Sequence, residues 1–283
     1  MLFRSWAKRV EWEKLKDRGD YFTARGMPEK AVPIYKKALA DSRQVRLLNN
    51  LAVALMHMER YAECAALFRE AIEKEPGNNE LKLNYAEACI YSGKISEAKA
   101  MLEDQPASAA AFRLFGELYD REGDAGNARM NLRAAAGPGA PDDNIYRLTD
   151  FYIKAREFDS ALTTLSRVKN QDARAAVKRA EICAAQSDFT QAAEILEKAL
   201  ITWPYDTELL LALSEYSRKK ADIERADQAI ARALALQPDS ARAKLEAVKV
   251  KLAQNSIREY QEALRRLINN LKNDYRDAEE AAI

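Results

Sequence analysis

Histidine, glycine, proline and cysteine are scarce in this sequence, and each shortage narrows the classes of protein it can encode. Its 283 residues include 1 histidine, 9 glycines, 8 prolines and 3 cysteines. The lone histidine, His57, argues against a catalytic triad and excludes a zinc site built on paired histidines. So few glycines and prolines argue against long disordered linkers. The composition therefore favours an ordered chain and does not suit an enzyme.

The sequence also lacks the motifs that mark phosphate-binding and nucleotide-binding enzymes. It has no G-x-x-x-x-G-K-[ST] loop and no G-x-G-x-x-G at the start of a helix. The cysteines (Cys64, Cys89 and Cys183) are odd in number and lack the C-x-x-C spacing of zinc sites. They are better explained as small buried hydrophobic residues. We therefore predict no enzyme activity, no catalytic residues, no cofactor and no metal.

Neither sign of charge is in excess, and long apolar runs are missing. Lysine and arginine number 45 against 44 aspartates and glutamates. Such a balance provides no bulk attraction to nucleic acid or to an acidic membrane. No apolar stretch has the length of a signal peptide core or a membrane span. The sequence therefore predicts a cytoplasmic protein with no nucleic-acid partner and no membrane span.

What the sequence does contain is a small residue that returns at intervals of 33, 34, 30, 33, 31 and 34 residues. These positions are Ala31, Cys64, Ala98, Ala128, Ala161, Ala192 and Ala226. A larger apolar residue, or tyrosine, follows each one four positions later, on the same face of a helix. A second stripe of small residues lies upstream: Gly19, Ala52, Ala86, Gly116, Thr149, Ala180 and Ser214. The pattern predicts close-packed helical hairpins stacked into a solenoid.

A turn position lies between the two stripes of each repeat. Three repeats have glycine there, at Gly26, Gly93 and Gly123, where the end of a helix often needs positive φ. The other repeats have Glu59, Arg156, Ser187 and Ala221. We therefore expect that the turn does not always depend on glycine.

Segments 50–52, 61–64 and 71–76 resemble the helix and turn signatures of the tetratricopeptide repeat family. The resemblance implies an all-α, right-handed superhelix of about seven helix-turn-helix repeats with a capping helix pair at the C-terminus. The predicted organisation is an N-terminal helix at 1–11, repeats one to four at 12–136, a Gly/Pro loop at 137–141, repeats five to seven at 142–240, a degenerate eighth repeat or cap at 241–273, and a tail at 274–283.

Two features of this organisation remain open. The loop at 137–141 is either a hinge between two blocks or an elongated loop within one stack, and Asp142 or Asp143 is expected to cap the next helix. At the N-terminus, an apolar helix face suits either a cover over the first repeat or contact with a membrane surface. That face combines Leu2, Phe3, Trp6 and Val10 with the basic residues Arg4, Lys8 and Arg9 around it.

In tetratricopeptide repeats the first helix of each hairpin lines a concave groove, so the resemblance places the ninth residue of each repeat there. Six of these seven residues are acidic: Asp20, Val53, Glu87, Glu117, Asp150, Glu181 and Glu215. Nearby positions supply Lys16, Arg46, Asn49, Asn50, Asn84, Arg113, Tyr146, Arg147, Arg174 and Lys178. Either this lining binds a polar segment that carries Lys or Arg, or its acids pair with bases on the same and neighbouring helices.

The predicted function is a protein–protein interaction scaffold or adaptor that binds a partner peptide or helix in this groove. An RNA-binding helical repeat is one alternative, disfavoured because the inner column is acidic. A self-assembling structural component is another. The carboxylate clamp of chaperone-binding members is matched at Lys16 and Asn50 but not at Asp20, Glu80 and Asn84, and two of these three are acids that would repel a carboxylate.

Overall fold

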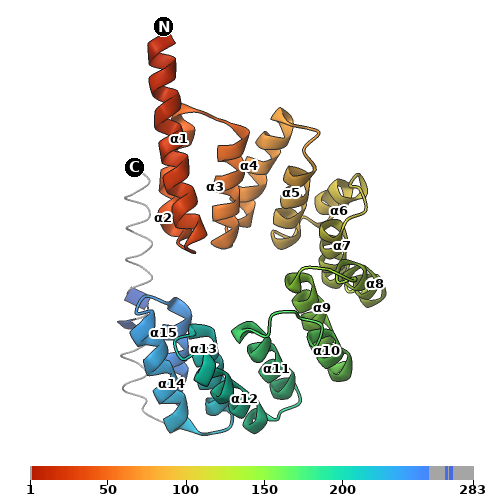
Figure 1. The fold of residues 1–283 in the computed structure, drawn as a ribbon, viewed down its shortest axis with the longest axis vertical. Coiled ribbons are helices and arrows are strands. Elements are labelled where there is room, and N and C mark those ends of the chain that lie inside the picture. The colour runs from red at the N-terminus through yellow and green to blue at the C-terminus, as the bar shows by residue number, and fades with distance from the viewer. Residues whose placement is uncertain (1, 255–264, 267, 270–283) are drawn as a thin grey trace. The chain divides into compact units, whose positions relative to one another are not determined.

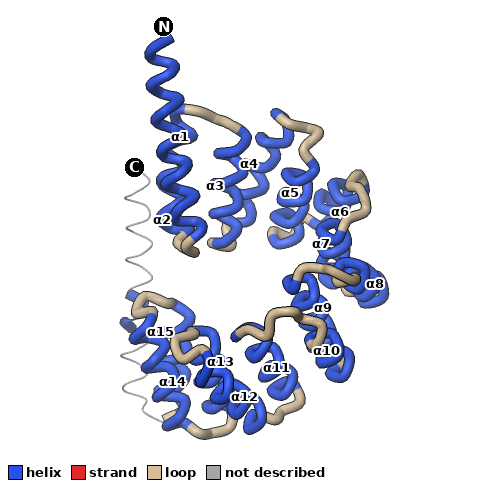
Figure 2. Tube along the Cα trace, in the orientation of Figure 1, coloured by secondary structure: helices blue, strands red, loops and turns tan. Residues whose placement is uncertain are grey.

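The computed structural model describes residues 2–254, 265–266 and 268–269, and the elements it describes are all helices (Figures 1 and 2). They are α1 (Leu2–Ala24), α2 (Pro28–Asp41), α3 (Val45–His57), α4 (Tyr61–Lys74), α5 (Asn79–Tyr91), α6 (Ile95–Glu103), α7 (Ala109–Glu122), α8 (Ala125–Ala135), α9 (Asp142–Lys154), α10 (Phe158–Leu165), α11 (Ala173–Ala185), α12 (Phe189–Thr202), α13 (Thr207–Lys219), α14 (Ile223–Leu236) and α15 (Ala241–Ala253). None of these helices is long and apolar enough to cross a membrane. The prediction of an all-α repeat fold is confirmed.

Consecutive helices pair into seven antiparallel hairpins, from α1–α2 to α13–α14. Within each unit, the second helix of a hairpin also packs against the first helix of the next hairpin, as α4 does on α5 and α12 on α13. The hairpins form two units, residues 1–138 (unit 1) and 139–283 (unit 2), and within each unit they follow one another in chain order (Figure 1). The boundary falls inside the 137–141 loop, and its role as a hinge stays a prediction.

The repeated small residues are the points where each hairpin is packed most tightly. All seven residues of the downstream stripe, from Ala31 to Ala226, are completely buried. The larger residues four positions later are at most 4% exposed: Tyr35, Phe68, Leu102, Leu132, Leu165, Leu196 and Ile230. Burying side chains of this size stabilises a fold by roughly 1.5–3 kcal/mol each. The stacked hairpins are therefore held by a core distributed along the chain.

Two glycines of the upstream stripe show how close the paired helices approach. A methyl group at Gly19 would lie 2.4 Å from the ring of Tyr35, and one at Gly116 would lie 2.6 Å from Cγ of Leu132. Both distances are far inside van der Waals contact, so neither position has room for alanine. The small residues at these positions are a steric requirement of the hairpin.

All seven turn residues adopt positive φ, whether or not they are glycine. The φ angles of Glu59, Arg156, Ser187 and Ala221 lie between 58° and 68°, close to the 66° of Gly26. After each turn residue, the next N–H donates to the carbonyl five residues back, as Arg60 does to Leu55 at 3.0 Å. This is the bond of a Schellman cap. Hydrogen bonds and packing therefore maintain the left-handed turn in the four repeats that lack glycine.

The prediction that Asp142 or Asp143 caps α9 is wrong. The N-cap is Pro141, because the helix already begins at Asp142 and both carboxylates fall within its first turn. Asp142 instead accepts the backbone N–H groups of Lys169 and Asn170 at 3.2 and 3.4 Å, and so anchors the loop after α10. A negative charge in the first turn still stabilises the helix, because it interacts favourably with the helix dipole.

The two ends of the chain are only partly described. The helix predicted at 1–11 is continuous with the first helix of the first repeat, as α1. The side chains of its amphipathic face (Leu2, Phe3, Arg4, Trp6, Lys8, Arg9 and Val10) lie outside the described part. Helix α15 is the first helix of the predicted cap, while most of the remainder of the cap and all of the 274–283 tail also lie outside it. Those predictions stay predictions.

Candidate partner-binding surface

The ninth residues of the repeats lie on the first helices α1, α3, α5 and α7 in unit 1 and α9, α11 and α13 in unit 2. Neighbouring first helices contact one another within each unit, so the residues form a continuous strip there. We call these two strips the first-helix faces. All seven residues are partly exposed, and each of the six acids forms an ion pair with a lysine or arginine.

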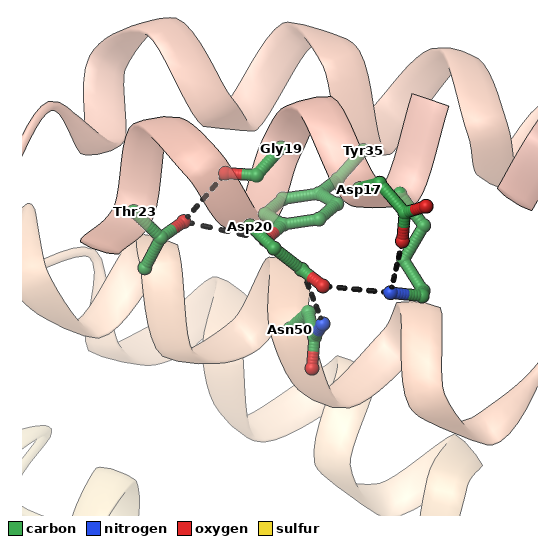
Figure 3. A network of polar contacts seen from close by, with 7 residues as sticks. Asp17, Gly19, Asp20, Thr23, Tyr35 and Asn50 are labelled. Carbon is green, nitrogen blue, oxygen red and sulfur yellow. Dashed lines mark hydrogen bonds and ion pairs between the residues drawn. The ribbon is translucent and has the colours of Figure 1, made fainter. Parts of the chain in front are cut away.

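Asp20 on α1 joins three helices through one carboxylate (Figure 3). Its Oδ2 lies 2.7 Å from Nζ of Lys16, one turn earlier on the same helix. Its Oδ1 accepts hydrogen bonds from the Tyr35 hydroxyl on α2 at 2.6 Å and from Asn50 Nδ2 on α3 at 2.7 Å. Lys16 also bonds Asp17 at 2.8 Å, which places two carboxylates on one ammonium group.

These contacts shift the pKa values of Asp20, Lys16 and Tyr35. Burial alone would raise the pKa of the Asp20 carboxyl, but the hydrogen bonds from Lys16, Tyr35 and Asn50 outweigh burial and lower it. Hydrogen bonds to Asp17 and Asp20 raise the pKa of Lys16. Burial, and then the bond to Asp20, raise the pKa of Tyr35. Near neutral pH, Asp20 is therefore a carboxylate and Lys16 an ammonium group, with Tyr35 as a neutral donor.

Arg113 on α7 is the centre of a second cluster in unit 1. Its guanidinium binds Glu87 on α5 through two bonds of 2.9 and 3.3 Å and Glu117 on its own helix at 3.0 Å. The Tyr91 hydroxyl donates to Glu117 at 2.9 Å. The three charged side chains are only 12–19% exposed. Burial alone would lower the pKa of Arg113, but the two carboxylates raise it.

Unit 2 repeats the arrangement around a lysine. Lys178 Nζ on α11 lies 2.8 Å from Asp150 on α9 and 2.7 Å from Glu181. Burial alone would lower the pKa of Lys178, but the two carboxylates raise it. Here the acids are more exposed, at 43% and 33%. We call these three groupings the charge triads: Asp17–Lys16–Asp20, Glu87–Arg113–Glu117 and Asp150–Lys178–Glu181.

The other predicted residues divide into several smaller contacts. Asn84 donates to Asn49 at 3.2 Å across α3 and α5, and Glu215 pairs with Lys219 at 2.7 Å. The guanidinium of Arg174 stacks 4.1 Å from the centre of the Tyr146 ring. Arg147 is the next residue of α9 after Tyr146. The remaining residue, Arg46, is exposed beside a cleft of about 290 Å³ that Asn49 also lines.

Sequence reasoning missed the tyrosines that complete two of the triads. Tyr35 occupies the position where most repeats have a purely apolar residue, and its ring is buried while its hydroxyl reaches Asp20. Tyr91 reaches Glu117 from the end of α5 in the same way. For Tyr35, the available signal was a polar atom at an otherwise apolar repeat position, which a buried site must satisfy.

The described residues contain no group of three or more His, Cys, Asp or Glu side chains that could hold a metal ion. The three cysteines are buried and free. Burial raises the pKa of each thiol, to about 12 for Cys64. Such thiols are poor nucleophiles at neutral pH.

Two sequence models described as tetratricopeptide repeat match the chain, one over residues 55–120 and the other over 16–79 and 150–207. Together they cover more than half of it. The chain belongs to the tetratricopeptide repeat family. Members of this family are in general protein–protein interaction scaffolds and typically non-catalytic.

Solved structures share the fold at low sequence identity. A chain in the crystal structure of the APC/C hetero-tetramer Cut9–Hcn1 matches with a TM-score of 0.55 and 16% identity, over 94% of this chain and 54% of that one. A tetratricopeptide repeat protein from Parabacteroides merdae matches with a TM-score of 0.52 and 14% identity, over 95% of this chain and 98% of that one. At such identities, the likeness extends to the fold alone.

Two curated proteins match shorter segments. The TPR repeat-containing thioredoxin TTL4 of Arabidopsis thaliana is 36% identical over 98 residues, which are 33% of this chain and 14% of that protein. The human protein O-mannosyl-transferase TMTC1 is 24% identical over 108 residues, which are 37% of this chain and 12% of that protein. The chain therefore spans only a small part of the length of either relative.

Proposed function

We propose that this chain is a non-enzymatic scaffold whose first-helix faces bind a segment of a partner protein that carries lysine or arginine side chains. The residues proposed to contact it are Asp20, Arg46, Asn49, Asn50, Asn84, Glu87, Arg113, Glu117, Tyr146, Arg147, Asp150, Arg174, Lys178, Glu181 and Glu215. The general role of tetratricopeptide repeats as interaction scaffolds supports the first part of the proposal. The charge of the described surface supports the second part.

The observation that carries the proposal is the composition of the charge triads. Each contains two carboxylates and one cation, so the side chains that make up each triad sum to one negative charge. All three have the same sign and recur on the first helices, whereas the whole chain is nearly neutral. A cationic side chain of a partner would complete the neutralisation of each triad.

The triad in unit 2 is better suited to receive such a side chain than the triad around Arg113. Asp150 and Glu181 are more exposed than the acids around Arg113, so their free lone pairs face solvent. A lysine also holds its acids as a point charge, without the two-bond geometry of arginine. Both features leave room for a further donor without loss of the internal ion pairs.

A peptide-display selection tests this proposal. The intact chain is expected to select peptides enriched in Lys and Arg over the starting library. A variant with Glu117→Gln, Asp150→Asn and Glu181→Gln removes three negative charges while it keeps the size of each side chain, and it is expected to lose that enrichment. The control carries Glu29→Gln, Glu73→Gln and Asp159→Asn, the same chemical changes at exposed positions on second helices.

Circular dichroism establishes that both variants retain their helices. If the folded triad variant selects the same basic peptides as the intact chain, the first-helix faces are not the binding surface. Selection of acidic peptides by all three proteins would contradict the proposed sign of the partner.

A further inference from the structure

A cleft of about 630 Å³ lies between α12 and α14, the second helices of two consecutive hairpins in unit 2. Its volume falls within the roughly 300–1,000 Å³ range of ligand pockets. The α12 wall consists of Glu194, Glu197, Lys198 and Ile201, and the α14 wall of Arg225, Gln228 and Arg232. The residues of each wall are spaced as one face of a helix. Because both are second helices, the walls run in the same direction.

The deeper part of the cleft is apolar. Leu200, Leu213 and Ala229 line it and are largely buried, so the cleft has a hydrophobic base between charged walls. Ile201 on the rim is 82% exposed, and Tyr205, just beyond the end of α12, is 79% exposed. Ile201 therefore adds exposed apolar surface to the rim of the cleft.

The charges of the walls do not cancel. Glu197 pairs with Arg225 across the cleft at 3.1 Å. Lys198 and Arg232 occupy the same position in consecutive repeats, on opposite walls, and neither has a carboxylate within ion-pairing distance among the described residues. Arg232 donates to the backbone oxygen of Pro204 at 3.1 Å. Glu194, one turn before Lys198, is the remaining acid and does not pair with it in the structure.

We infer that this cleft binds an acidic amphipathic helix of a partner protein. Its apolar side chains enter between α12 and α14 and contact Leu213 and Ile201. Its aspartates and glutamates meet Lys198 on the α12 wall and Arg232 on the α14 wall, which occupy equivalent positions of consecutive repeats. This surface is distinct from the first-helix faces, and it selects the opposite charge.

Two synthetic peptides of about 18 residues, or five helical turns, test the inference. Both carry the same leucine face; one has glutamates along its flanks and the other has lysines. Fluorescence anisotropy measures their binding to the full chain. The acidic peptide is expected to bind and the basic peptide to bind at least about tenfold more weakly at low salt.

Charge reversal locates the site. The double variant Lys198→Glu with Arg232→Glu is expected to weaken binding of the acidic peptide by about tenfold or more and to strengthen binding of the basic peptide. Lys36→Glu with Lys37→Glu, exposed residues on α2, changes the net charge equally and is expected to leave binding unchanged. Ile201→Ser changes no charge and lies at an exposed position. It is expected to weaken binding of the acidic peptide, and this result would separate the apolar contribution to binding from that of charge.

Three results would overturn the inference: no binding of the acidic peptide to the folded chain, equal loss in the Lys36/Lys37 control, or binding of both peptides alike. Light scattering over a range of concentrations detects the competing occupant, a second copy of the chain. Self-association that the Lys198/Arg232 reversal abolishes would assign the cleft to that contact instead.

Discussion

The two units form the same hairpins from different residues. Unit 1 has glycine in three of its four turns and at two of its four small stripe positions, Gly19 and Gly116. Unit 2 has no glycine at any of these places and uses Arg156, Ser187 and Ala221 in its turns. The turn φ angles nevertheless agree to within about 20°. Tertiary packing and the Schellman hydrogen bonds therefore impose the hairpin geometry. Where the turn residue is glycine, it adopts the positive φ angle without steric strain.

The arginine-centred triad of unit 1 and the lysine-centred triad of unit 2 differ in how they are held and shielded. The arginine triad of unit 1 is held by a two-bond contact and shielded from water, whereas the lysine triad of unit 2 has more exposed acids. The first joins α5 to α7 in a shielded contact, and the second joins α9 to α11 with acids that water reaches more easily.

Removal of the central cation should separate the two triads most clearly. Arg113→Ala leaves Glu87 and Glu117 shielded and uncompensated, so we expect it to lower the free energy of unfolding by about 3 kcal/mol. Lys178→Ala leaves acids that water can solvate, and we expect a loss of about 1 kcal/mol. Urea unfolding followed by circular dichroism measures both. Equal losses would show that the two triads contribute equally to the free energy of unfolding.

Glycine in the unit 1 stripe should be required by space. Gly116→Ala places a methyl group against Leu132 and is expected to destabilise the chain by about 2 kcal/mol. Gly126→Ala is the matched control, because the nearest atom to its methyl group is a side-chain oxygen at 3.5 Å. That change is expected to stabilise the chain by up to about 1 kcal/mol through helix propensity. Thermal melts that move in the same direction for both would argue against the tight contact.

The turns of unit 2 should become more stable when they receive the glycine that unit 1 already has. Ser187→Gly and Ala221→Gly relieve positive φ and are each expected to stabilise the chain by about 1 kcal/mol, while Gly123→Ala in unit 1 costs a similar amount. Differential scanning calorimetry detects these shifts. A loss of stability in the two glycine variants would mean that the side chains themselves hold these turns.

The cysteines give the smallest and most local comparison. Cys64 and Cys89 in unit 1 are fully buried, whereas Cys183 in unit 2 is 9% exposed. Because burial raises the thiol pKa, to about 12 for Cys64, the native thiols stay protonated at pH 8 and react slowly with a disulfide reagent. As the pH rises toward 12 the reaction should accelerate. Mass spectrometry of the labelled chain is expected to find Cys183 modified first.

Much of the fold could be predicted from the sequence because the same pattern of small and large residues recurs in seven repeats. The small stripe residues and the turn position follow from spacing and from the chemistry of glycine. The cap of α9 could not be predicted in this way. Whether Asp142 lies just before a helix or in its first turn differs by one residue, and the loop contacts that decide it are tertiary.

The sequence predicted which helix positions the site residues occupy, but not which of these residues pair with one another. Spacing alone put acids and bases on the first helices, but it left open whether they pair with each other. The structure pairs Glu87 with Arg113 and Asp150 with Lys178 between neighbouring hairpins. These contacts depend on the relative rotation of the helices, which a repeat period does not specify. The cleft between α12 and α14 has the same origin, because residues of separate hairpins line its walls.

Photo-crosslinking of a selected basic peptide tests the central claim most directly. The peptide carries a benzophenone side chain next to its lysine or arginine, and mass spectrometry maps where it attaches to the intact chain. We expect crosslinks on first helices, at α9 and α11 above all, beside Asp150 and Glu181. Crosslinks confined to the second helices, or unchanged in yield by Asp150→Asn with Glu181→Gln, would contradict the account.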